Sequence, residues 1–278
     1  MSTVQKVIKY LAMAFAICLI VSIFSGILGA VGFLTNLDIG GSGKSSDAVA
    51  EKVTAYPVDG AASELQIDIN AAKLTVKQGD AFCVESNLKH ISVSTDNGVL
   101  RIRENNRARL HADAVVTLTI PAGTVFTKAE ITTGAGKVDM DVLSAAVLDL
   151  ELGAGDAQIG TLNATQGSQI EGGTGRIVIE NGALHDLDME MGVGQMKLTS
   201  ALTGRCSLDL GVGETDLTLL GVKEDYTIYA EKGLGNCTVD GVSVSDEATV
   251  GNGPNAVDVE GGVGAVKVNF RAVAPVAA

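Results

Sequence analysis

The chain has 278 residues, of which 33 are acidic and 20 are Lys or Arg, and its formal net charge is −13. A surface this acidic argues against nucleic acid as a partner. The chain has no Trp, only 4% aromatic residues and 34 Gly. Its apolar residues are mostly small or aliphatic, which suits a narrow interior filled by stacked Leu, Ile, Val and Ala side chains.

The first predicted element is a membrane span over residues 10–34, a stretch of 25 residues without a charge. About 20 apolar residues suffice to cross the hydrocarbon core of a bilayer. Lys6 and Lys9 precede the stretch, whereas the first charge after it is Asp38. The positive-inside rule therefore predicts that residues 1–9 are cytoplasmic and that the rest of the chain is extracytoplasmic.

The alternative is a cleaved signal peptide. Its apolar region would be about 7 to 15 residues long and would end in small residues. The present stretch is longer, and Leu28 stands at the upstream position of the candidate cleavage site. We favour an uncleaved, single-pass anchor in the cell membrane.

Residues 35–56 are predicted to be a flexible linker, because they contain the run Gly-Gly-Ser-Gly-Lys-Ser-Ser. An extracytoplasmic domain of residues 57–278 comes next. Its first strands are expected at 64–69 and 74–76, and Asn97-Gly98 is a strong hairpin signal. We expect this less regular entry region to cap the repeats that come after it.

Seven Gly-x-Gly triplets dominate the rest of the chain. The steps between them are 19, 20, 19, 19, 22 and 29 residues, so a structural unit of about 19 residues repeats and becomes less regular over the last two steps. The triplets begin at Gly134, Gly153, Gly173, Gly192, Gly211, Gly233 and Gly262.

Each triplet separates two segments in which apolar and polar residues alternate, as in strands with one buried face. Leu148, Leu150 and Leu152 share one parity before a triplet. Ala157 and Ile159 have the other parity after it. A side-chain period of two forbids this shift unless the chain bends or gains a residue. We therefore predict a corner at the second Gly of each triplet, where a positive φ or close stacking requires glycine.

Two other kinds of Gly-rich site are excluded by the residues after the triplets. A phosphate-binding loop needs a helix directly after it, whereas a strand pattern comes next here. A calcium-binding nonapeptide repeat places Asp two positions after the last Gly, because calcium requires oxygen ligands. The residues at that position are mostly apolar: Val138, Ala157, Ile177, Met196, Thr215, Cys237 and Val266.

Three further elements lead into the triplets, namely Leu65-Gln66-Ile67-Asp68-Ile69, Asn97-Gly98-Val99-Leu100 and Ile120-Pro121-Ala122-Gly123. With the serial Gly-x-Gly strands they make the chain resemble the bacterial putative-adhesin domain family over roughly residues 57–270. The resemblance implies a β-helix-like domain of a bacterial envelope protein and brings no catalytic residues. We expect an all-β fold, a right-handed β-helix or β-solenoid with rungs of about 19 residues, preceded by one N-terminal transmembrane helix.

No catalytic, cofactor or metal site is predicted. His90, His111 and His185 have no metal-ligand spacing with one another or with Cys. Cys206 and Cys237 have inward parity, so buried thiols are favoured over a disulfide.

A basic loop is one candidate binding surface. It is either a solvated turn or a dock for a polyanion such as an anionic wall polymer or a lipid headgroup. Its members are Arg101, Arg103, Arg107 and Arg109.

An acidic ladder is the second candidate. Outward residues on the strands before the corner would align about 4.8 Å apart in stacked rungs. Such a ladder should attract cations or a cationic partner, unless Arg176, Lys197 and salt screen it. Its positions are Asp149, Glu151, Gln169, Glu171, Asp188, Glu190, Asp209, Asp258 and Glu260.

Three function classes stay open. We favour a membrane-anchored, non-enzymatic binding or scaffolding module of a bacterial envelope, with a wall polymer, a cationic peptide or an envelope protein as partner. A sensor or regulator of envelope stress is the alternative, and residues 1–9 are too short for it to signal without a membrane partner. A polysaccharide-active β-helix enzyme is disfavoured by the lack of Trp and of any convergent catalytic spacing.

Overall fold

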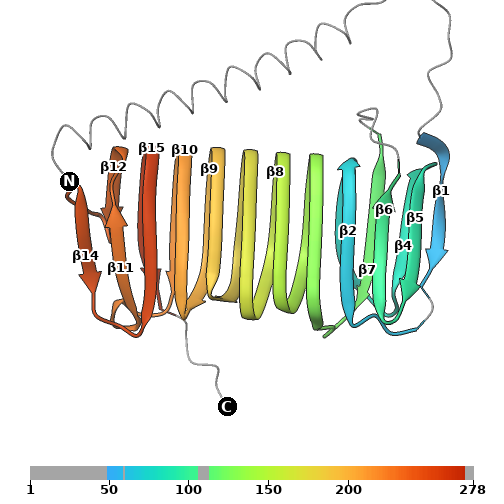
Figure 1. The fold of residues 1–278 in the computed structure, drawn as a ribbon, viewed down its shortest axis with the longest axis horizontal. Helices are drawn as coiled ribbons and strands as arrows, with labels where there is room; N and C mark the ends of the chain where they lie inside the picture. Colours follow the sequence, from blue (N-terminus) through green and yellow to red (C-terminus); the bar gives the residue numbers. More distant parts are fainter. Residues whose placement is uncertain (1–48, 59, 106–112, 273–278) are drawn as a thin grey trace, which may run out of the picture. The chain divides into compact units, whose positions relative to one another are not determined.

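The computed structural model describes residues 49–58, 60–105 and 113–272. The predicted anchor, residues 10–34, lies outside them, and among the described residues no helix is long and apolar enough to cross a bilayer. Apart from the short 3-10 helix η1 (Lys223–Asp225), the elements formed by the described residues are all strands (Figure 1). The strands are β1 (Val49–Pro57), β2 (Glu64–Ala71), β3 (Lys73–Gly79), β4 (Cys83–Leu88), β5 (Ile91–Asp96), β6 (Val99–Glu104), β7 (Val115–Pro121), β8 (Phe126–His185), β9 (Leu187–Thr203), β10 (Arg205–Leu220), β11 (Tyr226–Glu231), β12 (Leu234–Val239), β13 (Val242–Ser243), β14 (Glu247–Gly251) and β15 (Asn255–Arg271).

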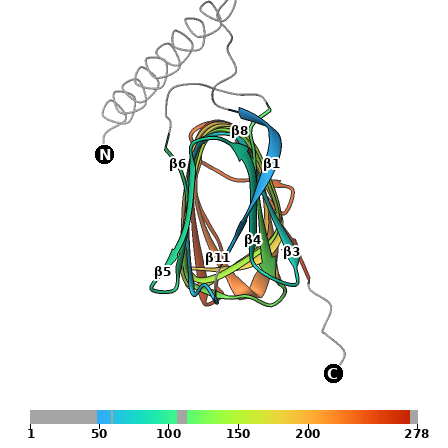
Figure 2. The ribbon, with the colours of Figure 1, turned by 90° about the vertical axis from the view of Figure 1, so that its right-hand side faces the viewer.

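The central strands stack in parallel, and each winds through two faces. Asp188 pairs with Gln169 on one side and with Ser207 on the other, each 19 positions away. We call the strand segments before each Gly-x-Gly triplet the first face and those after it the second face. Seen end on, the two faces form the long sides of a narrow outline, with β5 and β6 on one side and β3 and β4 on the other (Figure 2).

The core lies between the two faces and has the predicted alternation. Leu148, Leu150 and Leu152 are buried before the triplet, and Ala157 and Ile159 are buried after it. The buried positions are even-numbered before the triplet and odd-numbered after it, so the predicted change of parity is confirmed. The four residues between these two groups are all exposed. Aliphatic side chains fill this interior, and aromatic pairs lie toward its two ends: Phe82 with Phe126, and Tyr226 with Phe270.

Glycines stack on one another at the predicted corner. Gly194 has φ +144°, and a Cβ added to it would lie 2.8 Å from the carbonyl carbon of Gly175 and collide with its carbonyl oxygen. Six of the seven second glycines have φ between +136° and +148°. Gly235 lacks a positive φ, yet a Cβ there would still collide with the backbone of Gly264. Close stacking is thus common to all seven corners.

The order of the strands departs from the order of the repeats. β15 lies between β10 and the pair β11 and β12, and it is parallel to all three (Figure 1). Leu208 pairs with Val259, and Val259 pairs with Ala230, so the repeat around Gly262 precedes the repeat around Gly233 in space. The sequence predicts that the repeats stack in chain order. This prediction is wrong over the two wide steps of 22 and 29 residues.

Antiparallel strands close both ends of the parallel stack. β4 and β1 lie beyond β7 at one end, where β5 also pairs with β6, and β14 and β13 pair with β11 and β12 at the other. These strands cover edges that would otherwise be free to pair with another chain. β1 begins at Val49, so residues 49–56 belong to the sheet rather than to the predicted linker of residues 35–56.

The first corner, Asn70 to Ala72, has no glycine. A Cβ at Gly134 or Gly136 would collide with the carbonyl oxygen of Asn70 or Ala72, so the next corner stacks on this one. On the other side, the buried carboxylate of Glu104 accepts the backbone N–H groups of Asn70 (2.8 Å) and Ala71 (3.1 Å). Among the described residues, the Glu104 carboxylate rather than a glycine corner contacts the backbone of Asn70 and Ala71.

Candidate functional site

The acidic ladder of the first face exists and is longer than predicted. Its corner-side acidic column comprises the residues two positions before each triplet. Glu171 pairs with Glu190, Glu190 with Asp209, Asp209 with Glu260, and Glu260 with Glu231. Glu247 of β14 then pairs with Glu231. At its other end the column begins with Glu151, whose carboxylate accepts a hydrogen bond from Thr132 Oγ1 at 3.2 Å.

Two members of this column were missed from the sequence. Glu231 precedes a triplet with the right parity, so the alternation Tyr226 to Glu231 could have identified it. Glu247 lies on an antiparallel strand outside the repeat, and no local pattern indicates its neighbour.

A second, outer column is mixed. Its members are Gln66, Glu130, Asp149, Gln169, Asp188, Ser207, Asp258 and Tyr229. Partial burial raises the pKa of Asp149, and the neighbouring carboxylates of Glu151 and Glu130 raise it further. Lys128 contacts Glu130 and partly neutralises this end of the column.

The basic side chains form their ion pairs with acids other than the central acids of the first face. Arg176, a candidate for screening the ladder, forms an ion pair with Asp156 on the second face at 3.0 Å. Among the described residues, no ion pair within 4.0 Å involves any of six central acids of the first face. They are Asp149, Glu151, Glu171, Asp188, Glu190 and Asp209. These six acids of the first face are therefore not neutralised by ion pairs, whereas Asp156 of the second face is paired with Arg176.

The column is a linear array and not a chelating site. Parallel strands hold neighbouring carboxylates about 4.8 Å apart, and two unit charges at that distance repel by about 0.9 kcal/mol even in water. Within the part of the chain that the structure describes, no group of three or more His, Cys, Asp or Glu is arranged to hold a metal ion.

The predicted histidine and cysteine positions do not converge on a site. His185 Nδ1 lies 3.0 Å from Thr203 Oγ1, and its Nε2 lies 3.4 Å from Asp186. His111 lies outside the described residues. Cys206 and Cys237 are buried and unbridged as predicted, and burial raises the pKa of both thiols, so they are poor nucleophiles.

The basic surface is only partly described. Arg101 and Arg103 lie in β6 on the first face, where Arg101 donates to Gln66 at 3.2 Å and Arg103 lies 4.0 Å from Asp68. Arg107 and Arg109 lie outside the described residues, so the predicted polyanion dock remains a prediction.

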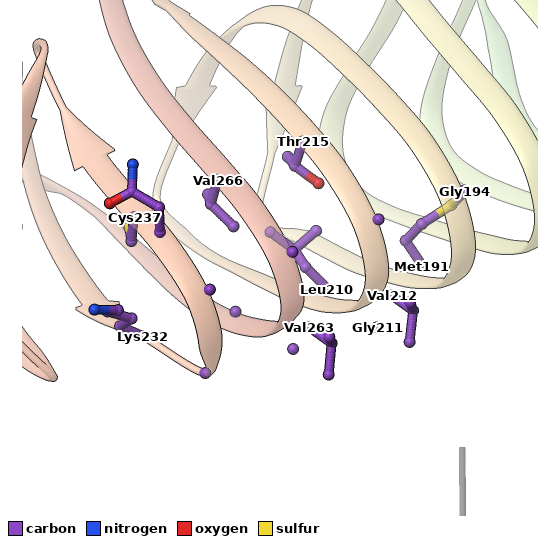
Figure 3. A pocket seen from close by; sticks show the side chains of 17 residues that line it. Met191, Gly194, Leu210, Gly211, Val212, Thr215, Lys232, Cys237, Val263 and Val266 are labelled. Carbon is purple, nitrogen blue, oxygen red and sulfur yellow. The ribbon is translucent and has the colours of Figure 1, made fainter. Parts of the chain in front are cut away.

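The glycine corner holds small hollows of about 20 Å³, each with room for roughly one water molecule. Figure 3 shows one of them, where Val212 and Val263 point away from the side occupied by Leu210 and Val266. These hollows result from glycine stacking and are too small for an organic ligand.

No protein-family model matches the chain, and no curated protein matches it. Solved structures with some likeness include a putative cell adhesion protein of Clostridium sporogenes, with 13% identity, a TM-score of 0.36 and coverage of 79% of this chain and 99% of that one. A putative adhesin of Bacteroides fragilis has 10% identity and a TM-score of 0.34, with coverage of 79% and 98%. A putative lipid binding protein of Parabacteroides distasonis has 14% identity and a TM-score of 0.33, with coverage of 78% and 96%. At this similarity the neighbours carry no argument about function, and the adhesin resemblance remains a prediction.

Proposed function

We propose that this chain is a membrane-anchored binding module without catalytic activity, which presents an acidic β-solenoid of about 19-residue rungs outside the cytoplasm. Its ligand is an extended cationic molecule, such as a cationic peptide or an amine-bearing wall polymer, that lies along the first face. The anchor is residues 10–34.

The corner-side acidic column is the observation that carries this proposal. Its side chains share one direction because they occupy equivalent positions on parallel strands, and Glu151, Glu171, Glu190 and Asp209 are all exposed. The screening length at physiological salt is about 8 Å, which exceeds the strand spacing, so the potentials of neighbouring carboxylates add. A ligand with regularly spaced ammonium groups would relieve the repulsion at several positions together.

The first face also suits binding better than turnover. A catalytic site needs a nucleophile, a base and an orienting group in one concave place. The columns instead spread similar side chains over successive strands, and repetition of this kind matches repetitive or extended ligands.

The test measures binding of a lysine decapeptide to the purified full-length chain by calorimetry at low and at physiological salt. The ladder variant carries Asp149→Asn, Glu151→Gln, Asp188→Asn and Glu190→Gln. Exposed ion pairs contribute roughly 0.2–1 kcal/mol each, so the loss of four should weaken binding by about fourfold at the least and by several hundredfold at the most.

A control variant removes the same charge from exposed acids outside the columns: Asp80→Asn, Asp96→Asn, Asp141→Asn and Asp240→Asn. We expect it to lose less than about threefold, because distant charges are screened. Equal losses in both variants would reduce the effect to net charge and reject the column as the binding site. Release of a cleaved product from any glycan tested would reject the non-enzymatic function.

A further inference from the structure

The second face carries a hollow of about 240 Å³ over the coils formed by β8, β9, β10 and β15. Lys197, Lys267, Glu214 and Asp216 line it with charged groups, and Arg176 lies at one side. On the same measure, this volume is about twelve times that of each single-water hollow at the glycine corner. The hollow therefore has room for a small molecule.

Strand pairing alternates the charges around this hollow. Asp216 pairs with Lys197 on one side and with Lys267 on the other, which gives a column Lys, Asp, Lys across three adjacent coils. The insertion of β15 beside β10 creates this arrangement, because Lys267 belongs to β15.

These opposite charges do not form ion pairs with one another. Within the described residues, no ion pair within 4.0 Å joins Asp216 to Lys197 or Lys267. Asp216 instead accepts a hydrogen bond of 3.4 Å from Asn269 Nδ2.

The contrast with the first coils of the same face is direct. There, Asp139 is bridged by Lys73 at 2.8 Å and by Lys137 at 3.4 Å, and these contacts lower its pKa against the effect of partial burial. Arg176 beside the hollow likewise forms an ion pair with Asp156. In the described part of the chain, two ammonium groups and two carboxylates thus surround the hollow without such ion pairs.

We propose that this hollow binds a small zwitterion, whose phosphate or carboxylate contacts Lys197 or Lys267 and whose ammonium group contacts Asp216 or Glu214. The two charges of the ligand need to lie about one strand spacing apart, roughly 4.8 Å. The two carboxylates would repel a simple anion, and the two ammonium groups would repel a simple cation. Only a molecule with both charges complements the alternation. The site lies on the face opposite the acidic columns, so it is independent of the proposed function.

The test uses the purified full-length chain and calorimetric titration with phosphoethanolamine, which has a phosphate and an ammonium group separated by two carbons. Inorganic phosphate and ethanolamine serve as the single-charge probes. We expect phosphoethanolamine to bind at least tenfold more tightly than either. Equal affinity for phosphate and phosphoethanolamine would reject the zwitterion. The absence of saturable binding at about 10 mM would reject the site, since a weaker Kd corresponds to a binding free energy smaller than about 2.7 kcal/mol.

Three variants locate the binding. The double change Lys197→Gln and Lys267→Gln, and separately Asp216→Asn, should each weaken phosphoethanolamine binding at least fivefold. Lys137→Gln removes a charge from the same face away from the hollow and should leave the affinity unchanged. Unchanged binding in the first two variants would overturn the assignment.

Glycerophosphoethanolamine, the phosphodiester found in a lipid headgroup, distinguishes the source of the ligand. Tighter binding of this diester than of phosphoethanolamine would assign the site to lipid headgroups, whereas tighter binding of the monoester would assign it to a soluble zwitterion. Whichever of the two ligands binds more tightly, the proposal requires that its binding be lost in the variant with both Lys197→Gln and Lys267→Gln.

Discussion

Replacing Gly194 by Ala tests whether glycine stacking holds the corner together. Gly194 combines two constraints, a φ of +144° and a position at which a Cβ would collide with the carbonyl oxygen of Gly175. Two other glycines separate these constraints. Gly123 has φ +78° but open space around an added Cβ, and Gly167 has open space and no positive φ.

The three positions predict three magnitudes. Gly167→Ala should change the free energy of unfolding by less than about 1 kcal/mol and could stabilise the chain by reducing the entropy of its unfolded state. Gly123→Ala should cost about 1–2 kcal/mol, because it places a side chain in a left-handed conformation. Gly194→Ala adds an overpacking cost of about 1–3 kcal/mol to that strain, for a total of roughly 2–5 kcal/mol.

Thermal unfolding measured by circular dichroism, with urea unfolding in parallel, gives these differences. For a domain of this size, each kcal/mol shifts the melting temperature by about 2–4 °C, so Gly194→Ala should melt roughly 4–20 °C lower than the parent chain. A melting temperature for Gly194→Ala no lower than that of Gly123→Ala would refute the argument from backbone collision. Equal values for all three variants would also remove the argument from φ.

Three further outcomes are expected. Glu104→Leu should cost about 2–4 kcal/mol in urea unfolding, because two N–H groups lose their buried acceptor, whereas Glu104→Gln keeps an acceptor oxygen and should cost less than half as much; equal costs would contradict the capping role. The raised pKa of Asp149 means that its ionised form destabilises the fold, so its contribution is favourable below pH 3.8, the ordinary value, and is lost as the pH rises through the higher folded pKa. Asp149→Asn should therefore raise the melting temperature at pH 7 and lose this advantage at pH 3, and a difference independent of pH would contradict the assignment. Protease added outside intact cells should remove the domain beyond residues 10–34, and protection until lysis would reject its extracytoplasmic location.

Local chemistry explains how much of the fold the sequence predicts. Leu150 and Ile159 reveal opposite parities on either side of a triplet, and that shift requires a corner whatever the rest of the chain does. Outward acids such as Glu171 and Glu190 obey the same parity, so the acidic ladder could also be predicted. These features depend on residues close together in the sequence.

The neighbours of β10 could not be predicted in the same way. The repeats around Gly233 and Gly262 present the same corner glycines and the same buried parity, so either could stack on Gly211. Which of the two repeats stacks on the repeat around Gly211 depends on contacts between segments that are distant in the sequence. The pairing of Asp216 with Lys267, and with it the hollow on the second face, results from that choice and has no local signal.

The place of β15 means that the order in which the strands are synthesised differs from their order in the stack. β9 and β10 each add to a coil that already exists when they emerge from the ribosome. β11 and β12 pair on one side with β14 and β13 and on the other with β15, so they have no partner in the earlier stack until β15 has been made. Until β15 is made, residues 226–251 lack the strand that joins them to the stack in the folded protein. A nascent chain stalled before residue 255 would leave β10 as an open strand edge, and such an edge is free to pair with a neighbouring copy.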